Sequence, residues 1–149
     1  MKIQTEIVPM TENLSAAAAS LEAQCFSAPW SRNMIAESAA RDDMVFLCAL
    51  VGGEYAGHAG MRCVLDEGQI CNVAVSPSFR RMGVGSMLLD ALKREALLRG
   101  LTVLMLEVRV SNTAAQALYE KNGFLRVGMR RSFYSCPRED AFLYNFDLC

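Results

Sequence analysis

The apolar segments of this chain are short, and their length limits what the chain can fold into. The longest, Met44–Val51, has eight residues, whereas a membrane-spanning helix needs about 20. We therefore predict a buried strand here and no membrane partner. Gly52 and Gly53 form a tight turn, and Glu54–Val64 and Gln69–Ser76 are two more strand-like segments, separated by a turn at 66–68. These three strands are expected to form an antiparallel meander.

Helical periodicity, with apolar residues three and four positions apart, marks four further segments. These segments are 11–24, 31–41, 83–99 and 112–122. Thr11 and Ser31 are candidate N-caps for the first two, because their side-chain oxygens can accept from the free N–H groups of a first turn. Gly100 and Gly123 stand where the last two helices are expected to end, as glycine commonly does.

Four remaining segments, 2–8, 101–110, 124–131 and 141–148, have the character of strands. The complete order of expected elements is β-α-α-β-β-β-α-β-α-β-β. This order predicts an α/β fold with a mixed central β-sheet flanked by helices. A length of 149 residues suffices for one hydrophobic core, so we expect a single domain over residues 1–149.

Charge is divided unevenly along the chain, although the formal net charge is only −1. Residues 1–70 contain 4 basic and 9 acidic side chains, whereas residues 71–149 contain 11 and 7. The small net charge argues against direct nucleic-acid binding by the chain as a whole. Ordinary scatter is one explanation of the division. The other is a cleft with one basic and one acidic side, the acidic side formed by Glu22, Glu37, Asp42 and Asp43.

The histidine and cysteine content predicts no metal site. His58 is the single histidine, which excludes any centre that needs two imidazole ligands. The six cysteines show no C-x-x-C or other metal-binding spacing. No apolar signal-peptide segment follows Lys2, so reduced thiols and a cytoplasmic location are expected.

The most informative segment for function is Asn72–Gly85, in which a strand leads to a loop with two arginines and two glycines and then to a helix. Glycine allows a ligand to approach the backbone closely, and a helix N-terminus offers free N–H groups to an anion. The segment predicts a phosphate or pyrophosphate site; the alternative is a turn with two solvated arginines. A Walker loop is excluded because Ser86 and Met87 follow the last glycine, and a dinucleotide fingerprint because Leu88 replaces its third glycine.

The run Arg80-Arg81-Met82-Gly83-Val84-Gly85 resembles the R/Q-x-x-G-x-G/A motif of the GNAT acetyltransferases. The resemblance covers nearly the whole chain, because the expected element order is also that of the GNAT fold. It implies that this loop binds the pyrophosphate of acetyl-CoA, the co-substrate of the family. The residues that the resemblance assigns to acetyl-CoA are Val73, Ala74 and Val75 (through their backbone), Arg80, Arg81, Met82, Gly83, Val84, Gly85, Ser86 and Asn112.

Four shorter segments resemble one group within that superfamily, the bacterial ribosomal-protein-alanine N-acetyltransferases. The segments are F-S-A-P-W-S at 26–31, L-E-V-R-V-S-N at 106–112, A-L-Y-E-K-N-G-F at 117–124 and R-E-D-A at 138–141. The resemblance implies direct acetyl transfer to a protein N-terminal amine, the N-terminal alanine of a basic small-subunit ribosomal protein. The alternatives are a lysine or small-amine acetyltransferase of the same fold and a non-catalytic acetyl-CoA-binding module.

Glu107 is the candidate general base. It interrupts the apolar segment 101–110, and strand alternation places it on the same side as Val103, Met105 and Arg109. From the pattern alone, a solvated carboxylate or one paired with Arg109 is the alternative. The resemblance implies that Glu107 accepts the proton of the acceptor amine.

Tyr119 is the candidate partner of the departing CoA thiolate. It lies about two turns into the helix that begins near Asn112, where an aromatic packed against the sheet is the alternative. The resemblance implies that it acts as an acid, and a hydrogen bond to the developing thiolate is the less demanding form of that role. The acceptor is expected to bind between the loop that contains Phe26 and Trp30 and the loop between the last two strands, which contains Tyr134, Glu139 and Asp140.

Overall fold

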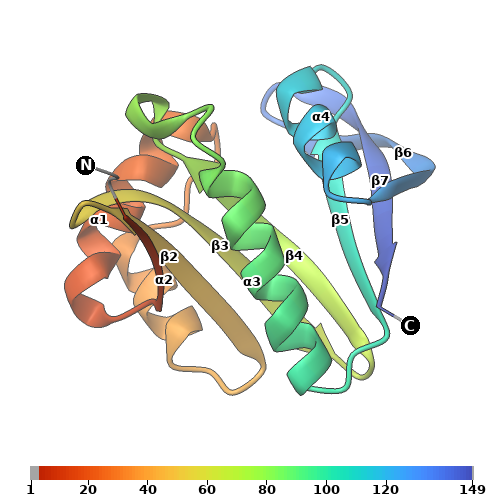
Figure 1. Cartoon of the computed structure of the whole chain (residues 1–149). Helices are drawn as coiled ribbons and strands as arrows, with labels where there is room; N and C mark the ends of the chain where they lie inside the picture. Colours follow the sequence, from red (N-terminus) through yellow and green to blue (C-terminus); the bar gives the residue numbers. More distant parts are fainter. Residues whose placement is uncertain (1–3, 149) are drawn as a thin grey trace.

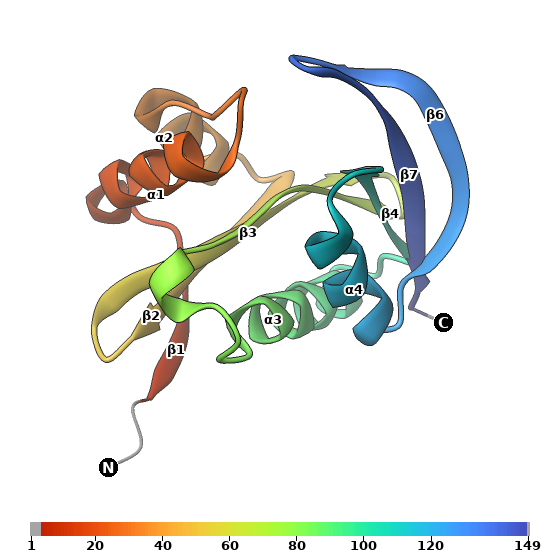
Figure 2. The same ribbon diagram turned by 90° about the horizontal axis from the view of Figure 1, so that it is seen from above.

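The computed structural model describes residues 4–148 as one seven-stranded sheet with helices on both faces (Figures 1 and 2). The strands are β1 (Thr5–Pro9), β2 (Met44–Val51), β3 (Glu54–Val64), β4 (Glu67–Val75), β5 (Val103–Arg109), β6 (Leu125–Ser135) and β7 (Arg138–Asp147). The helices are α1 (Glu12–Cys25), α2 (Arg32–Ala39), α3 (Val84–Leu98) and α4 (Thr113–Lys121), and a short 3₁₀ turn, η1 (Pro77–Phe79), precedes α3. The predicted element order and the mixed α/β fold are confirmed.

The spatial order of the strands is β1-β2-β3-β4-β5-β7-β6. The strands β2, β3 and β4 form the predicted antiparallel meander, joined at its first turn by Gly52 and Gly53, which both have positive φ. Among the strands of residues 4–148, β4 and β5 are the one parallel pair, and α3 crosses between them. The strand β7 lies between β5 and β6, so the last hairpin returns toward the middle of the sheet.

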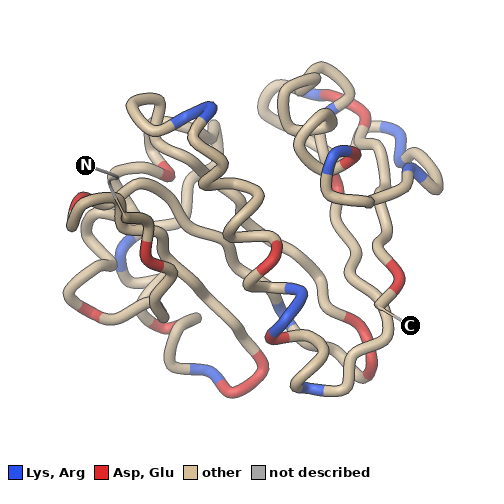
Figure 3. Tube along the Cα trace, viewed as in Figure 1, with Lys and Arg blue, Asp and Glu red and all other residues tan. Residues whose placement is uncertain are grey.

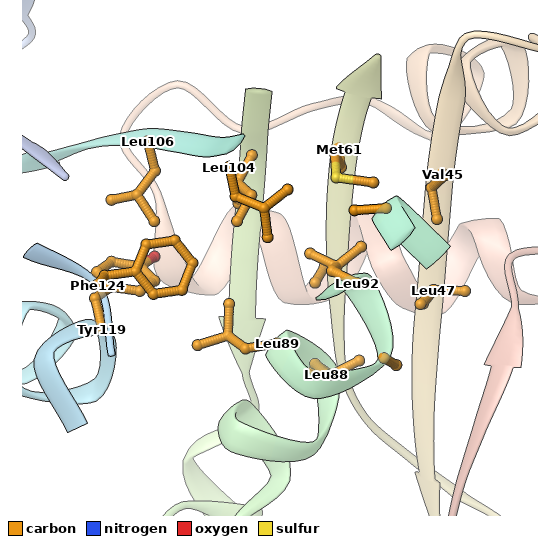
Figure 4. Close-up of a cluster of buried hydrophobic side chains, with 14 of the residues drawn as sticks. Val45, Leu47, Met61, Leu88, Leu89, Leu92, Leu104, Leu106, Tyr119 and Phe124 are labelled. Atoms are coloured by element: carbon orange, nitrogen blue, oxygen red, sulfur yellow. The ribbon is translucent and has the colours of Figure 1, made fainter. Parts of the chain in front are cut away.

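The helices α3 and α4 lie on one face of the sheet, and α1 and α2 lie on the other (Figure 2). On one face, Leu88, Leu89 and Leu92 of α3 are fully buried against β2 and β3 (Figure 4). Burying one such side chain contributes about 1.5–3 kcal/mol, so this face holds the main core. On the other face α1 packs on β3 and β4 and α2 packs on β2, where Phe46 and Cys48 are buried.

The strands β4 and β5 are paired at one end only. Their register joins Glu67–Gln69 to Val103–Met105, although β4 continues to Val75. Beyond that short ladder the two strands diverge, as Figure 1 shows. The backbone of residues 70–75 therefore has no β5 partner, and those of its N–H and C=O groups that face this edge can bind something else.

The prediction of a long loop between the last two strands is wrong. Only Cys136 and Pro137 separate β6 from β7, so Tyr134, Glu139 and Asp140 lie in strands. Cross-strand hydrogen bonds hold this extension, including one from the Ser132 N–H to Asp140 Oδ1 at 2.7 Å. Two register shifts interrupt the ladder, and they hide the period-two pattern by which these residues would have been recognised as strand.

The remaining element boundaries agree with the predictions within a few residues. The first strand begins at Thr5, and residues 2 and 3 of the predicted strand lie outside the described residues. Ser31 caps α2 as predicted, accepting from the Met34 N–H at 3.2 Å, whereas the Thr11 side chain makes no cap bond. Within residues 4–148, no helix is long and apolar enough to cross a membrane.

Candidate active site

A cavity of about 550 Å³ lies beside the free edge of β4. Its walls come from the end of β4, from the loop and first turn of α3, and from α4. The lining contains every residue that the sequence assigned to acetyl-CoA except Met82. The side chain of Met82 is 48% exposed and lies outside the lining, because the backbone turns at Arg81 and Gly83, both of which have positive φ.

The N-terminus of α3 supplies free donors to this cavity. Gly83 is the N-cap residue with a φ of 79°, and no side chain caps the helix. The first helical hydrogen bond runs from the Met87 N–H to the Gly83 carbonyl. Among the described residues, the N–H groups of residues 84–86 therefore have no partner, and all three residues line the cavity. Such an uncapped N-terminus, with the positive end of the helix dipole, suits an anion.

Two guanidinium groups stand beside these amides. Arg80 and Arg81 both line the cavity, and Arg80 Nε donates to the backbone oxygen of Val75 at 3.3 Å, which ties the loop to the end of β4. Figure 3 shows this positive charge at the tip of the loop that precedes α3. The loop for which the sequence predicts a phosphate site therefore brings free amides next to two arginines.

The opposite wall of the cavity is α4, and its first turn is fixed by Asn112. The side chain of Asn112 caps the helix by accepting from the Ala115 N–H at 3.1 Å. At the far end of α4, Asn122 Nδ2 donates to Ser86 Oγ at 3.0 Å and so joins α4 to α3. Gly85 allows the two helices to approach, because a Cβ there would lie 3.0 Å from a methyl carbon of Leu118.

A second cavity of about 300 Å³ adjoins the first. Six residues line both cavities: Cys25, Phe26, Val73, Asn112, Ala115 and Tyr119. The second cavity also has Glu107 of β5, Trp30 of the loop between α1 and α2, and Tyr134 of β6 in its lining. The two cavities therefore meet beside the free β4 edge, with Tyr119 at their junction and Glu107 in the lining of the second cavity.

Glu107 lies in the second cavity as an exposed side chain, on the face that alternation predicted. Its neighbour Arg109 is paired elsewhere: Nη1 donates to Glu139 Oε1 at 3.1 Å, and the guanidinium lies 4.2 Å from the Tyr134 ring centroid. The alternative of a carboxylate paired with Arg109 is therefore wrong. Burial, and after it the charge of Glu107, raises the pKa of Tyr134, which lines the same cavity.

Tyr119 is 7% exposed and lies where the two cavities meet. Its ring packs between Phe124 and Tyr144, with centroids 5.8 and 6.2 Å away, so the predicted packing role is also real. Burial raises the pKa of the Tyr119 phenol well above its usual value. Among residues 4–148 its hydroxyl has no hydrogen-bond partner, so the O–H is free to donate to a ligand.

The five residues predicted for the acceptor separate into two groups. Phe26, Trp30 and Tyr134 line the second cavity. Glu139 and Asp140 do not; Glu139 accepts from the Ser111 N–H at 2.7 Å and from Arg109, and Asp140 holds the β6–β7 hairpin. Hydrogen bonding to Ser111, and after it the Arg109 interaction, lowers the pKa of Glu139. Both carboxylates therefore stabilise the structure around the second cavity and do not line it.

The predicted acidic side of the cleft is also smaller than expected. Glu22 is 1% exposed, because it is hydrogen-bonded inside the fold. Asp43 is paired with Arg41 at 2.7 Å and lies 3.6 Å from Arg62. One sign of the buried Glu22 was present in the sequence, since it occupies the helix face that also carries the apolar residues Ala18 and Leu21.

Comparisons with known proteins find a family and several relatives that this chain resembles. The acetyltransferase (GNAT) family matches residues 16–124. The chain is 39% identical over 129 residues to the [ribosomal protein bS18]-alanine N-acetyltransferase of Escherichia coli K12, covering 85% of this chain and 86% of that protein. It is 32% identical to a putative enzyme of the same name from Bacillus subtilis, covering 83% and 82% of the two chains. The crystal structure of the E. coli ribosomal-protein-S18-alanine N-acetyltransferase superposes with a TM-score of 0.86 at 34% identity, covering 97% of this chain and 94% of that one.

Proposed function

The chain belongs to the acetyltransferase (GNAT) family, and from this premise we propose that it acetylates the N-terminal alanine of a small-subunit ribosomal protein of the bS18 type. It is an acetyl-CoA-dependent N-acyltransferase. The observation that carries the proposal is that the two cavities meet at Tyr119, with Glu107 in the lining of the second cavity. The named relatives supply the acceptor, since they match over more than four fifths of the chain.

The first cavity suits acetyl-CoA. The free amides of residues 84–86 with Arg80 and Arg81 would hold the pyrophosphate, because together they present donors and positive charge to an anion. The unpaired edge of β4 at residues 73–75 would hydrogen-bond the pantetheine arm and orient the thioester carbonyl. When bound, acetyl-CoA supplies the activated acetyl group, and the protein supplies alignment.

Glu107 would accept the proton of the acceptor amine, directly or through a water molecule. An α-amine has a pKa of about 7.7–8.0, against about 10.4 for lysine. Near neutral pH a substantial fraction of N-termini is therefore already uncharged, and an exposed carboxylate is a sufficient base. The position of Glu107 in the second cavity supports this role.

Tyr119 would stabilise the departing thiolate by a hydrogen bond. Full proton transfer from a phenol of pKa about 10 to a thiol of about 8.5 is uphill by about 2 kcal/mol. The raised pKa of the buried phenol makes that transfer still less favourable, and it also keeps the hydroxyl protonated and able to donate. A donor that strengthens its hydrogen bond as charge develops lowers the barrier without moving its proton.

The second cavity would hold the acceptor peptide between Trp30 and Tyr134, with its N-terminus directed to the junction. The proposal includes one catalytic domain over residues 1–149, direct transfer within a ternary complex, and a cytoplasmic location, where ribosomal proteins are synthesised. Exposed Glu37 and Asp42 remain as negative charges that a basic acceptor protein could meet.

An acetylation assay tests the proposal with three acceptors. They are a peptide with a free N-terminal alanine and the following sequence of bS18, the same peptide with a blocked N-terminus and an internal lysine, and a polyamine. Turnover of the free-alanine peptide alone is the expected result. Turnover confined to the blocked lysine peptide or the polyamine would contradict the N-terminal assignment. Binding of acetyl-CoA without turnover of any acceptor would indicate a binding module.

A further inference from the structure

One buried carboxylate has no part in the chemistry described above. Glu22 of α1 lines the second cavity, and its oxygens accept three hydrogen bonds from three parts of the fold. Oε1 accepts from the Trp30 backbone N–H at 3.1 Å and from Asn72 Nδ2 at 3.2 Å. Oε2 accepts from His58 Nε2 at 2.8 Å. A carboxylate removed from water is costly unless donors of this kind surround it.

His58 is hydrogen-bonded through both of its ring nitrogens. The His58 ring is fully buried in β3, and its Nδ1 lies 2.6 Å from the Tyr55 hydroxyl. A carboxylate has no proton to donate, so the imidazole carries a proton on Nε2 and donates it to Glu22. The Tyr55 hydroxyl also donates to Cys48 Sγ at 3.7 Å. His58 is therefore held between Tyr55 and the carboxylate that it orients.

Glu22 joins the two sides of the reaction site. Trp30 belongs to the loop between α1 and α2, which lines the second cavity. Asn72 is the residue immediately before Val73, where the lining shared by the two cavities begins on β4. A second contact supports the same connection: the Trp30 ring packs on Phe46 at 6.3 Å, and Phe46 packs on His58 at 5.3 Å.

We propose that Glu22, oriented by His58, is a positioning residue that fixes the acceptor loop (residues 26–31) relative to the thioester-binding strand. It acts through the Trp30 backbone and the Asn72 side chain and does not touch the reacting atoms. The inference rests on the proposed function, because it assigns a task within the acceptor site. It predicts that loss of the carboxylate weakens acceptor binding and leaves acetyl-CoA binding intact.

The unmodified protein provides the first test. Trp30 precedes α2 and its N–H takes no part in a helix or strand, yet the bond to Glu22 should protect that amide from hydrogen exchange. Neighbouring amides of Ser27 and Ala28 donate no hydrogen bond among the described residues and should exchange freely. Trp30 exchange as fast as that of Ser27 and Ala28 would overturn the proposal. This measurement requires no acceptor and no turnover.

Variants provide the second test. Glu22→Leu should raise the KM for the acceptor peptide about tenfold, as loss of one such anchoring network would, with the KM for acetyl-CoA changed by less than about twofold. Because Trp30 is the single tryptophan, acrylamide quenching of its fluorescence should rise in the same variant. Glu22→Gln should largely retain the wild-type values, because an amide still accepts from Trp30 and Asn72 and can donate to the other tautomer of His58.

Glu12→Gln is the matched control, because it removes an exposed carboxylate from the same helix. It should leave both KM values and the quenching unchanged. A folded Glu22→Leu protein with wild-type quenching and wild-type acceptor KM would overturn the inference, as would an equal rise in both KM values. Failure of the wild-type protein to acetylate any acceptor would instead contradict the proposed function, while the Trp30 exchange result would still decide whether Glu22 holds the loop.

Discussion

At the scale of single residues, Glu107 differs from the nearby carboxylates of Glu22 and Glu139 in that no donor among residues 4–148 is hydrogen-bonded to it. Among residues 4–148, the carboxylates of Glu22 and Glu139 are both fixed by hydrogen bonds, whereas Glu107 makes no ion pair. A base must be free to exchange a proton with its substrate. This difference is the structural reason to prefer Glu107 among these carboxylates.

Glu107→Gln should therefore lower kcat/KM by about 100-fold or more at pH 6.5, where the acceptor amine is mostly protonated. The loss should be smaller at pH 9, where the amine is already neutral. A pH–rate profile of both proteins measures this difference. A loss of equal size at every pH would indicate that Glu107 only positions the acceptor. Glu54→Gln, an exposed site in the β2–β3 turn region, controls for the change in net charge.

Tyr119→Phe should lower kcat about tenfold and leave the melting temperature nearly unchanged. The ring keeps its packing on Phe124 and Tyr144, and the lost hydroxyl has no partner among the described residues. Because burial raises the pKa of the phenol, the protonated donor persists through alkaline pH, and wild-type activity should show no loss from Tyr119 ionisation between pH 7 and 10. Kinetics and thermal unfolding check both statements. A large fall in melting temperature would show that the hydroxyl is structural.

At the scale of elements, the turn before α3 can be tested against a turn of the same conformation elsewhere. Gly83 and Gly100 have φ values of 79° and 74°, and a Cβ at either would meet no atom within 4 Å. Alanine at either position should cost about 1–2 kcal/mol of stability, because side chains disfavour this conformation. Only Gly83→Ala should also weaken acetyl-CoA binding, about tenfold, since Gly83 lines the cavity. Calorimetry of both variants checks this, and equal affinities would contradict the site.

The elements that could be predicted are those whose signals are local. Ser31 and Gly100 mark helix ends by their own chemistry, and the alternation around Glu107 identifies its face without any knowledge of partners. The end of β6 could not be predicted, because its bulges remove the alternation and its bonds come from Asp140 in the next strand.

At the scale of the whole molecule, contacts between residues far apart in the chain could not be predicted from sequence patterns. The insertion of β7 between β5 and β6 is decided by pairing between separated strands. Likewise, Glu22 and His58 are 36 positions apart, and neither residue reveals the other. The pyrophosphate loop was predictable because all its parts lie in one short segment; the acceptor side was less so, because it is assembled from α1, β4, β5 and β6.

Acetyl-CoA should stabilise the whole molecule, because its cavity is built from both sides of the divergence between β4 and β5. At a concentration 100-fold above Kd, binding contributes about 2.7 kcal/mol. For a domain of this size that corresponds to a rise in melting temperature of roughly 5–10 °C. A thermal unfolding series in acetyl-CoA measures the rise, and Arg80→Ala should reduce it. A melting temperature independent of acetyl-CoA would contradict the site.

The short ladder between β4 and β5 also has a mechanical consequence. Three register pairs connect the strands at the middle of the sheet, and beyond them the two sides separate. Force applied between the β2–β3 turn at Gly53 and the β6–β7 turn at Cys136 should therefore rupture the molecule at this joint first. A bound ligand that spans the divergence would carry part of the load. Single-molecule pulling should then record a higher rupture force with acetyl-CoA present. The co-substrate would thus strengthen the mechanical connection between the β1–β4 part of the sheet and the β5–β7–β6 part.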